Sequence, residues 1–131
     1  RAMVLPKSMR LKGYRCFYYL HKYGVRFHGP SMVLRVVEAK RNLLKNSYRD
    51  LKLESCRCAI AISSKVSKKA VIRNQIRRSL HDHLNQRLSK KTQFANSWAL
   101  FSLKPNSSSI HQRSLLLEEC DLLLRKAGLF E

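Results

Sequence analysis

Acidic residues are scarce in this chain: among its 131 residues, 8 Asp and Glu stand against 27 Lys and Arg. Metal-dependent hydrolytic sites are built from clustered carboxylates or histidines, and most of these acids are scattered. Glu118, Glu119 and Asp121 are close in sequence, but on a helix they would diverge, so we expect a solvated face. The shortage of acids argues against a polypeptide that hydrolyses its substrate by itself.

Long apolar runs are also missing from the sequence. No segment approaches the roughly 18 to 20 consecutive apolar residues that a membrane-spanning helix needs, and the N-terminus lacks the apolar run of a secretory signal. We therefore expect a cytoplasmic protein with no membrane partner. Arg1 and Ala2 stand before Met3, and we expect Met3 to be the natural start, with residues 1–2 added ahead of it.

The 4 cysteines are not arranged for metal binding. Of 4 cysteines, only Cys56 and Cys58 are close together, and the second paired half of a zinc site is absent. We expect buried free thiols and no metal on the protein. His81 and His83 point in different directions on a helix, so we interpret them as ordinary helix residues.

Positive charge is what the sequence has in excess, with a formal net charge of +19. The segment from Lys65 to Arg78 holds 6 cations and no carboxylate. Apolar residues such as Val71, Ile72 and Ile76 interrupt it, whereas a disordered basic tail has nothing to bury. We therefore expect a structured cationic surface. Its natural partner is a polyanion, since Lys and Arg that neutralise phosphates release counterions and gain affinity.

Hydrophobic periodicity indicates one small domain over residues 1–131. An extended basic segment covers residues 1–12, residues 38–54 form a long loop, and residues 105–109 form a turn. The spacing predicts helices at 13–23, from 69 or 70 to about 88, and at 110–126, and strands at 25–29, 31–37, 56–63 and 97–103. This order predicts an α/β (α+β) two-layer sandwich, with helices packed on one small sheet.

The second helix carries separate apolar and cationic faces. Its predicted inward stripe is Ile72, Ile76, Leu80, His83 and Leu84. At about 100° per residue, Arg73 and Arg77 form a neighbouring row, and Asn74 and Arg78 form the next. These rows predict a flat cationic face. In the third helix the inward residues are Leu116, Cys120, Leu123 and Leu124, and Gly128 ends it.

The cationic segment also resembles a family signature. The matching residues are Lys65, Ala70, Val71, Arg73, Asn74, Arg77 and Arg78. They resemble the signature of the bacterial ribonuclease P protein component. Four segments upstream resemble the same family. They are Leu5-Pro6-Lys7, Arg10-Leu11-Lys12, the helix with Phe17, Leu20, His21 and Gly24, and the stretch from Met32 to Val36. The chain departs from the signature at Gln75 and His81, where the family usually has arginine, at Ser67, which replaces a glycine, and at Cys16, where an acid is common.

The resemblance implies a specific fold and specific RNA contacts. The order would be α-β-β-β-α-β-α, a ribosomal-protein-like fold with a small mixed sheet and a left-handed βαβ crossover, an exception to the right-handed preference. Residues implied in binding the catalytic RNA are Lys65, Lys68, Lys69, Arg73, Asn74, Arg77 and Arg78. Residues implied in binding the 5′ leader of precursor tRNA, in a cleft between the first helix and the sheet, are Phe17, His21 and Arg35.

The implied function is that of the non-catalytic protein subunit of the endoribonuclease ribonuclease P, which removes the 5′ leader from precursor tRNA. The catalytic centre would belong to the RNA, which would also bind the Mg²⁺ cofactor, and no small-molecule substrate is expected. The alternative is an architectural RNA-binding protein of ribosomal type, which charge and fold class fit equally well. For the residues implied in RNA contact, the alternatives are structural. Phe17 could pack in the core, Arg35 could be an ordinary surface charge, and the basic helix could simply face solvent.

Overall fold

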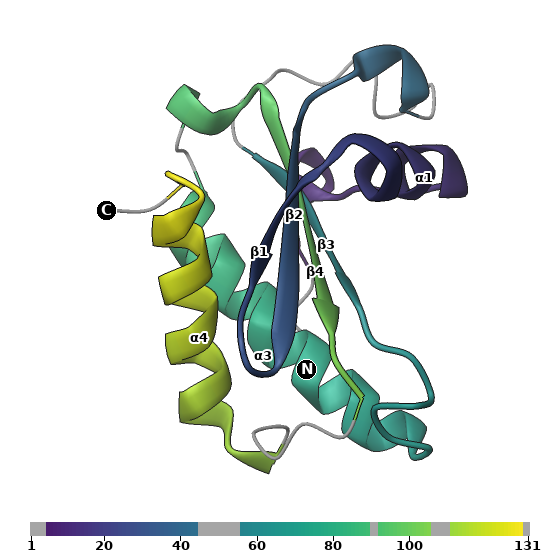
Figure 1. The fold of residues 1–131 in the computed structure, drawn as a ribbon, viewed down its shortest axis with the longest axis vertical. Helices are drawn as coiled ribbons and strands as arrows, with labels where there is room; N and C mark the ends of the chain where they lie inside the picture. Colours follow the sequence, from purple (N-terminus) through teal and green to yellow (C-terminus); the bar gives the residue numbers. More distant parts are fainter. Residues whose placement is uncertain (1–4, 45–55, 90–91, 106–110, 130–131) are drawn as a thin grey trace.

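The computed structural model describes residues 5–44, 56–89, 92–105 and 111–129, which form a mixed α+β fold (Figure 1). Their helices are α1 (Tyr14–Tyr23), α3 (Ala70–Leu88) and α4 (Arg113–Lys126), and their strands are β1 (Val25–His28), β2 (Met32–Glu38), β3 (Arg57–Ala61) and β4 (Ser97–Leu103). Short 3-10 turns lie at Lys7–Met9, Arg41–Leu43 and Thr92–Phe94. Each predicted helix and strand is confirmed, with ends that move by a few residues.

The strands form one sheet in the order β1-β2-β4-β3. The pairs β1–β2 and β2–β4 are antiparallel, and β3–β4 is parallel, so the predicted mixed sheet is confirmed. The parallel pair is joined through α3, as a parallel connection requires a crossover. The left hand of that crossover stays a prediction.

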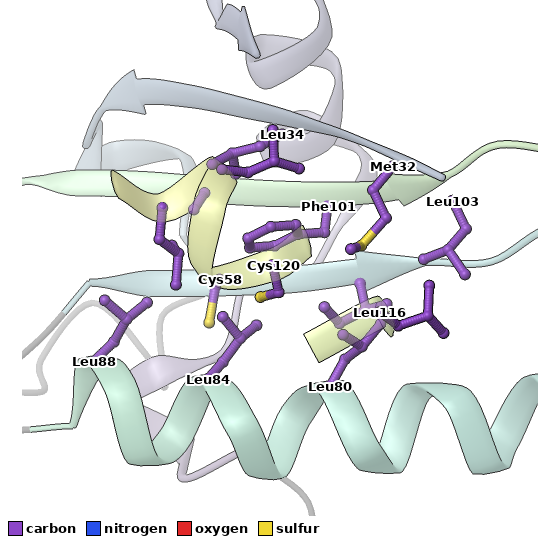
Figure 2. Packing of buried hydrophobic residues seen from close by; sticks show 14 of the residues in the cluster. Met32, Leu34, Cys58, Leu80, Leu84, Leu88, Phe101, Leu103, Leu116 and Cys120 are labelled. Carbon is purple, nitrogen blue, oxygen red and sulfur yellow. The ribbon is translucent and has the colours of Figure 1, made fainter. Parts of the chain in front are cut away.

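The core lies on both faces of this sheet. Successive residues of a strand point to opposite faces, and β4 is buried on both: Phe101 packs with α3 and α4, whereas Trp98 and Leu100 pack with α1. Figure 2 shows Leu80, Leu84 and Leu88 of α3 pointing toward the sheet. The sheet and the α3–α4 pair are the two layers of the sandwich, and α1 covers part of the opposite face (Figure 1).

The predicted inward residues are confirmed except for Ile72, which is half-buried at the edge of the core. Ile76, Leu80, His83 and Leu84 of α3 are buried, and so are Leu116, Cys120, Leu123 and Leu124 of α4. Gly128 follows α4 with a φ of 76°, a left-handed conformation that suits glycine at a helix end. The four cysteines are free and buried. Burial raises the pKa of the Cys56 thiol to about 12.

The described part of the N-terminal segment, residues 5–12, differs from the extended arm expected for residues 1–12. Lys7–Met9 form a 3-10 turn, and Leu5, Met9 and Leu11 are buried. The guanidinium of Arg57, itself only 2% exposed, donates from Nη1 to the carbonyl oxygens of Lys7 at 2.9 Å and Arg10 at 2.8 Å. The segment is therefore part of the fold, docked against β3.

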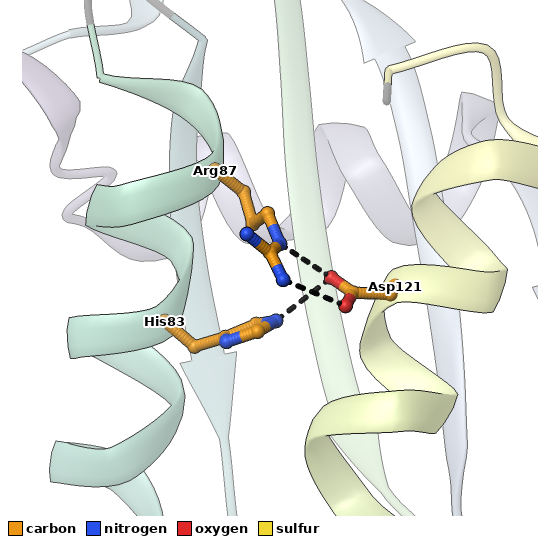
Figure 3. A network of polar contacts seen from close by, with 3 residues as sticks. All are labelled: His83, Arg87 and Asp121. Atoms are coloured by element: carbon orange, nitrogen blue, oxygen red, sulfur yellow. Dashed lines mark hydrogen bonds and ion pairs between the residues drawn. The ribbon is translucent and has the colours of Figure 1, made fainter. Parts of the chain in front are cut away.

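The acids of α4 are not the solvated face predicted from their spacing. Glu118 is exposed, but Glu119 is 8% exposed and its Oε2 accepts a hydrogen bond from the Ser31 amide at 2.9 Å. Asp121 binds two residues of α3 (Figure 3): His83 Nε2 lies 2.7 Å and Arg87 Nε 2.9 Å from Oδ1. The prediction was wrong because two of these acids have partners far away in sequence. Glu119 bonds to Ser31, just before β2, and Asp121 bonds to His83 and Arg87 of α3.

Two predicted segments are only partly described. Residues 45–54 of the predicted loop and 106–109 of the predicted turn lie outside the described residues, as do Arg1 and Ala2. Of the loop, Glu38 belongs to β2 and Leu44 is buried. Among the described helices, none is both long and apolar enough to cross a membrane.

Candidate nucleic-acid interface

A cationic surface, here called the basic segment (residues 65–78), leads into α3 and forms its first turns. Lys65, Lys68 and Lys69 are exposed, while Val66 is buried and anchors the connection. The connection is ordered by serine hydroxyls: Ser63 Oγ accepts from the Lys65 amide and Ser67 Oγ accepts from the Lys69 amide, both at 3.3 Å. The lysines are thus held outward on a defined backbone.

The arginines of the basic segment are positioned by local hydrogen bonds. Arg73 Nη1 donates to the Ser67 carbonyl at 2.8 Å, which ties the helix to the connection before it. Arg77 Nη1 donates to Asn74 Oδ1 at 2.8 Å, so Asn74 holds a neighbouring arginine. Arg78 is exposed. The first turn of α3 contains no acid, so these cations add to the positive end of the helix dipole.

A cleft lies between α1, β3 and α3, where the leader cleft is expected. It is a cavity of about 330 Å³. Phe17 of α1 lines it together with Arg10, Lys12 and His81, over an apolar floor from β3. Phe17 is only partly buried and also packs against the core cluster that contains Leu20, which is fully buried as predicted. The aromatic ring therefore offers one side to the cleft.

His21 and Arg35 lie apart from the walls of that cleft. His21, one turn after Phe17, is exposed. Desolvation first, and the nearby charge of Arg35 second, lower the pKa of His21. The two residues therefore lie close enough to interact electrostatically, although the cleft itself is bounded by other residues.

Arg35 is more than a plain surface charge. The residue is half-buried on β2, opposite Arg26 of β1, and desolvation and then Arg26 lower its pKa. Among the described residues, one buried polar atom of a side chain has no hydrogen-bond partner, and this atom is Nε of Arg35. An unsatisfied buried donor costs about 1–3 kcal/mol.

Three polar residues that line the cleft were not predicted from the sequence: Arg10, Lys12 and His81. Arg10 and Lys12 lie in a segment that resembles the family, and this resemblance could have indicated that they contact RNA. His81 occupies a position where the resembled signature usually has arginine. Burial, Arg77 and Arg10 together lower the pKa of His81 to about 4, so this imidazole is neutral at neutral pH. The cleft wall is thus less charged at this point than an arginine would make it.

The comparison with protein families decides what the chain is. The family model described as Ribonuclease P matches residues 5–128. The chain belongs to the ribonuclease P protein family. It is 60% identical over 127 residues to the ribonuclease P protein component of Prochlorococcus marinus (strain MIT 9313), covering 97% of this chain and 98% of that protein. It is 53% identical to the component of Synechococcus sp. (strain CC9902), with the same coverage.

Solved structures of this family share the fold. The ribonuclease P protein of Staphylococcus aureus superposes with a TM-score of 0.69 at 16% identity, covering 94% of this chain and 98% of that one. The Thermotoga maritima protein gives 0.65 at 17% identity, covering 88% and 96%. As a ribonuclease P protein component, the chain is part of an endoribonuclease and ribonucleoprotein of tRNA processing, with an RNA partner. This membership replaces the alternative of a ribosomal architectural protein.

Proposed function

We propose that this protein binds the catalytic RNA through the basic segment and the 5′ leader of precursor tRNA in the cleft beside Phe17. The observation that carries the proposal is that both surfaces share one helix. Arg77 of the basic segment and His81 of the cleft wall stand one turn apart on α3. A protein bound to the catalytic RNA by this helix would present its cleft beside the RNA, where a leader enters.

The chemistry of each surface supports its role. Arginine suits folded RNA because its planar guanidinium donates to phosphate in pairs and stacks on bases. Single-stranded nucleic acid is held by ring stacking together with cations, and the cleft supplies Phe17 with Arg10 and Lys12. The exposed His21 and the half-buried Arg35 extend this set beyond the cleft.

Cleavage itself is assigned to the RNA, with Mg²⁺ bound there. The support is the donor set of the polypeptide: two of its eight acids, Glu119 and Asp121, are held by Ser31 and by His83 with Arg87. The described residues contain no group of three or more His, Cys, Asp or Glu placed to hold a metal. We place the complex in the cytoplasm and give the protein no membrane or small-molecule partner.

Reconstitution with a bacterial catalytic RNA at low Mg²⁺ tests this function. We expect the protein to stimulate cleavage of precursor tRNA and to be inactive when freed of RNA. Phe17→Ala should weaken binding of precursor relative to mature tRNA by about 1–3 kcal/mol. Phe27→Ala is the matched control, because Phe27 is also half-buried but packs against the other core cluster. It should lower stability and keep the discrimination.

Two results would overturn the assignment of the leader site. One is full discrimination in Phe17→Ala and His21→Ala together with a large fall in thermal midpoint, since truncation of a core phenylalanine costs about 3–5 kcal/mol. The other is an equal loss of discrimination in Phe27→Ala. For the catalytic RNA, Arg77→Ala should weaken binding and flatten the log-affinity against log-salt slope by roughly one. Lys126→Ala, which removes an exposed cation at the C-terminal end of α4, should leave both unchanged.

A further inference from the structure

The solvent side of α1 carries large aromatic side chains that the fold does not use. Tyr14 is 81% exposed, Tyr18 61% and Tyr23 60%. Aromatic rings usually bury most of their area, and three exposed rings on a helix of ten residues form an unusual surface. Tyr19 differs, because its ring packs edge-on against the buried Trp98 with centroids 6.1 Å apart.

These tyrosines border a hollow of about 380 Å³ on the flank of α1 away from Phe17, here called the tyrosine hollow. Arg15 and Lys40 also line it, and none of the described residues in its lining carries a carboxylate. Lysines lie over the rings: Lys22 Nζ is 5.7 Å from the Tyr18 centroid, and Lys40 Nζ is 5.5 Å from that of Tyr19. Rings interleaved with cations are the arrangement by which proteins hold single-stranded nucleic acid.

The tyrosine hollow is continuous with the leader residues around the helix. At about 100° per residue, the side chains follow one another around α1 in steps of roughly 20–40°. The order is Phe17, His21, Tyr14, Tyr18 and then Lys22. The ring that borders the cleft, the exposed imidazole and the exposed tyrosines therefore lie along one path across the solvent face, from one hollow to the other.

We propose that the tyrosine hollow binds nucleobases of the distal part of the 5′ leader, after the strand leaves the cleft and crosses α1. This rests on the proposed function, because it extends the same strand. Single-stranded RNA fits the lining better than a protein does, since the cations meet phosphates and the rings stack on bases of any sequence. Longer leaders would then bind more tightly than short ones.

The test measures the affinity of the reconstituted complex for precursor tRNAs with leaders of about 4 and about 16 nucleotides, the span of single-strand-binding modules. The variant is Tyr14→Ala with Tyr18→Ala. We expect it to weaken binding of the long leader about fivefold or more, since stacking is worth at least about that factor per base. The short leader and mature tRNA should bind as before.

Two control variants separate ring stacking from other effects. Tyr14→Phe with Tyr18→Phe keeps both rings and should retain the affinity for the long leader. Leu122→Ala removes a side chain of α4 that is 48% exposed and should change neither affinity. Tyr19 is left intact because of its contact with Trp98.

The outcomes distinguish leader binding in the tyrosine hollow from leader binding in the cleft beside Phe17. Unchanged affinity for the long leader in the alanine variant overturns the inference, and so does an equal loss for both leader lengths, which would assign the tyrosines to the catalytic RNA or to the fold. If Phe17→Ala alone weakens the short-leader precursor, the leader cleft stands and the extension fails. If neither variant affects either leader, both fail.

Discussion

His81 should make this protein less stable in mild acid, and its replacement should remove that sensitivity. Burial first, then the charges of Arg77 and Arg10, lower its pKa from 6.5 to about 4 in the folded state. The unfolded chain therefore takes up a proton at a higher pH than the folded one. The resulting stabilisation is complete above about pH 6.5 and is lost as the pH falls toward 4.

The size of this effect follows from the difference between the two pKa values. At 1.36 kcal/mol per pKa unit, a fall from 6.5 to about 4 sets an upper limit of about 3 kcal/mol. His81 lines the open cleft and is partly exposed, so solvent screens its neighbours. We therefore expect a loss of about 1–2 kcal/mol between about pH 7 and about pH 4.5 from this residue.

Urea unfolding of the RNA-free protein at several pH values measures the effect. His81→Gln keeps a polar side chain that does not titrate, so its free energy of unfolding should fall by about 1–2 kcal/mol less than that of the parent protein over this range. His28→Gln removes an exposed imidazole at the end of β1 and serves as the control. Parallel pH profiles for the parent protein and His81→Gln would refute the reasoning.

Two further substitutions probe the polar contacts of the core. Arg57→Leu should lower the free energy of unfolding by about 2–4 kcal/mol, because two carbonyls of the N-terminal segment lose a charged donor. Urea unfolding measures this loss, with Arg26→Leu on the edge strand β1 as the control. A loss of less than about 0.5 kcal/mol in Arg57→Leu would contradict the prediction. Asp121→Asn should cost about 1–2 kcal/mol near neutral pH. Burial raises the pKa of Asp121, but Arg87 and His83 overcome it and the net shift is downward. The stabilisation is thus present above pH 3.8, the ordinary pKa of an aspartate, and is lost as the pH falls through the lower pKa of the folded state. The free energies of unfolding of Asp121→Asn and of the parent protein should therefore converge in strong acid. The control Glu118→Gln changes an exposed acid and should differ little from the parent protein at any pH.

The sequence predicts the regular elements well because their signals are local. Residues 97–103 read as a strand and form β4 with those bounds, and the apolar stripe of α3 is confirmed at Leu80 and Leu84. Burial of polar groups follows different rules. Glu119 is buried because the chain brings the Ser31 amide to it across 88 positions. Arg57 is buried because the carbonyls of residues 7 and 10 surround it. Such pairings depend on topology, which periodicity does not encode.

The candidate site divides in the same way. The cationic segment is predictable because charge and motif are both local, and its lysines are exposed as expected. Phe17 borders the cleft, as the resemblance implied. The side chains that were missed, His81 and the exposed tyrosines, belong to walls made by two or more elements. Their contribution becomes visible only when α1 is placed against the sheet.

The position of β4 has a consequence for how the protein is made. β4 is the last strand in the sequence, yet it lies between β2 and β3, which it joins. As the chain leaves the ribosome at about 5–20 residues per second, β3 has no partner strand in the final sheet until residue 103 has emerged. In a nascent chain that ends before β4, the β1–β2 hairpin is the one strand pair of the described sheet that can form. The cleft, which needs β3 set in the sheet, therefore forms only after β4 has been made, and nascent chains that stop short of β4 do not offer RNA a finished surface.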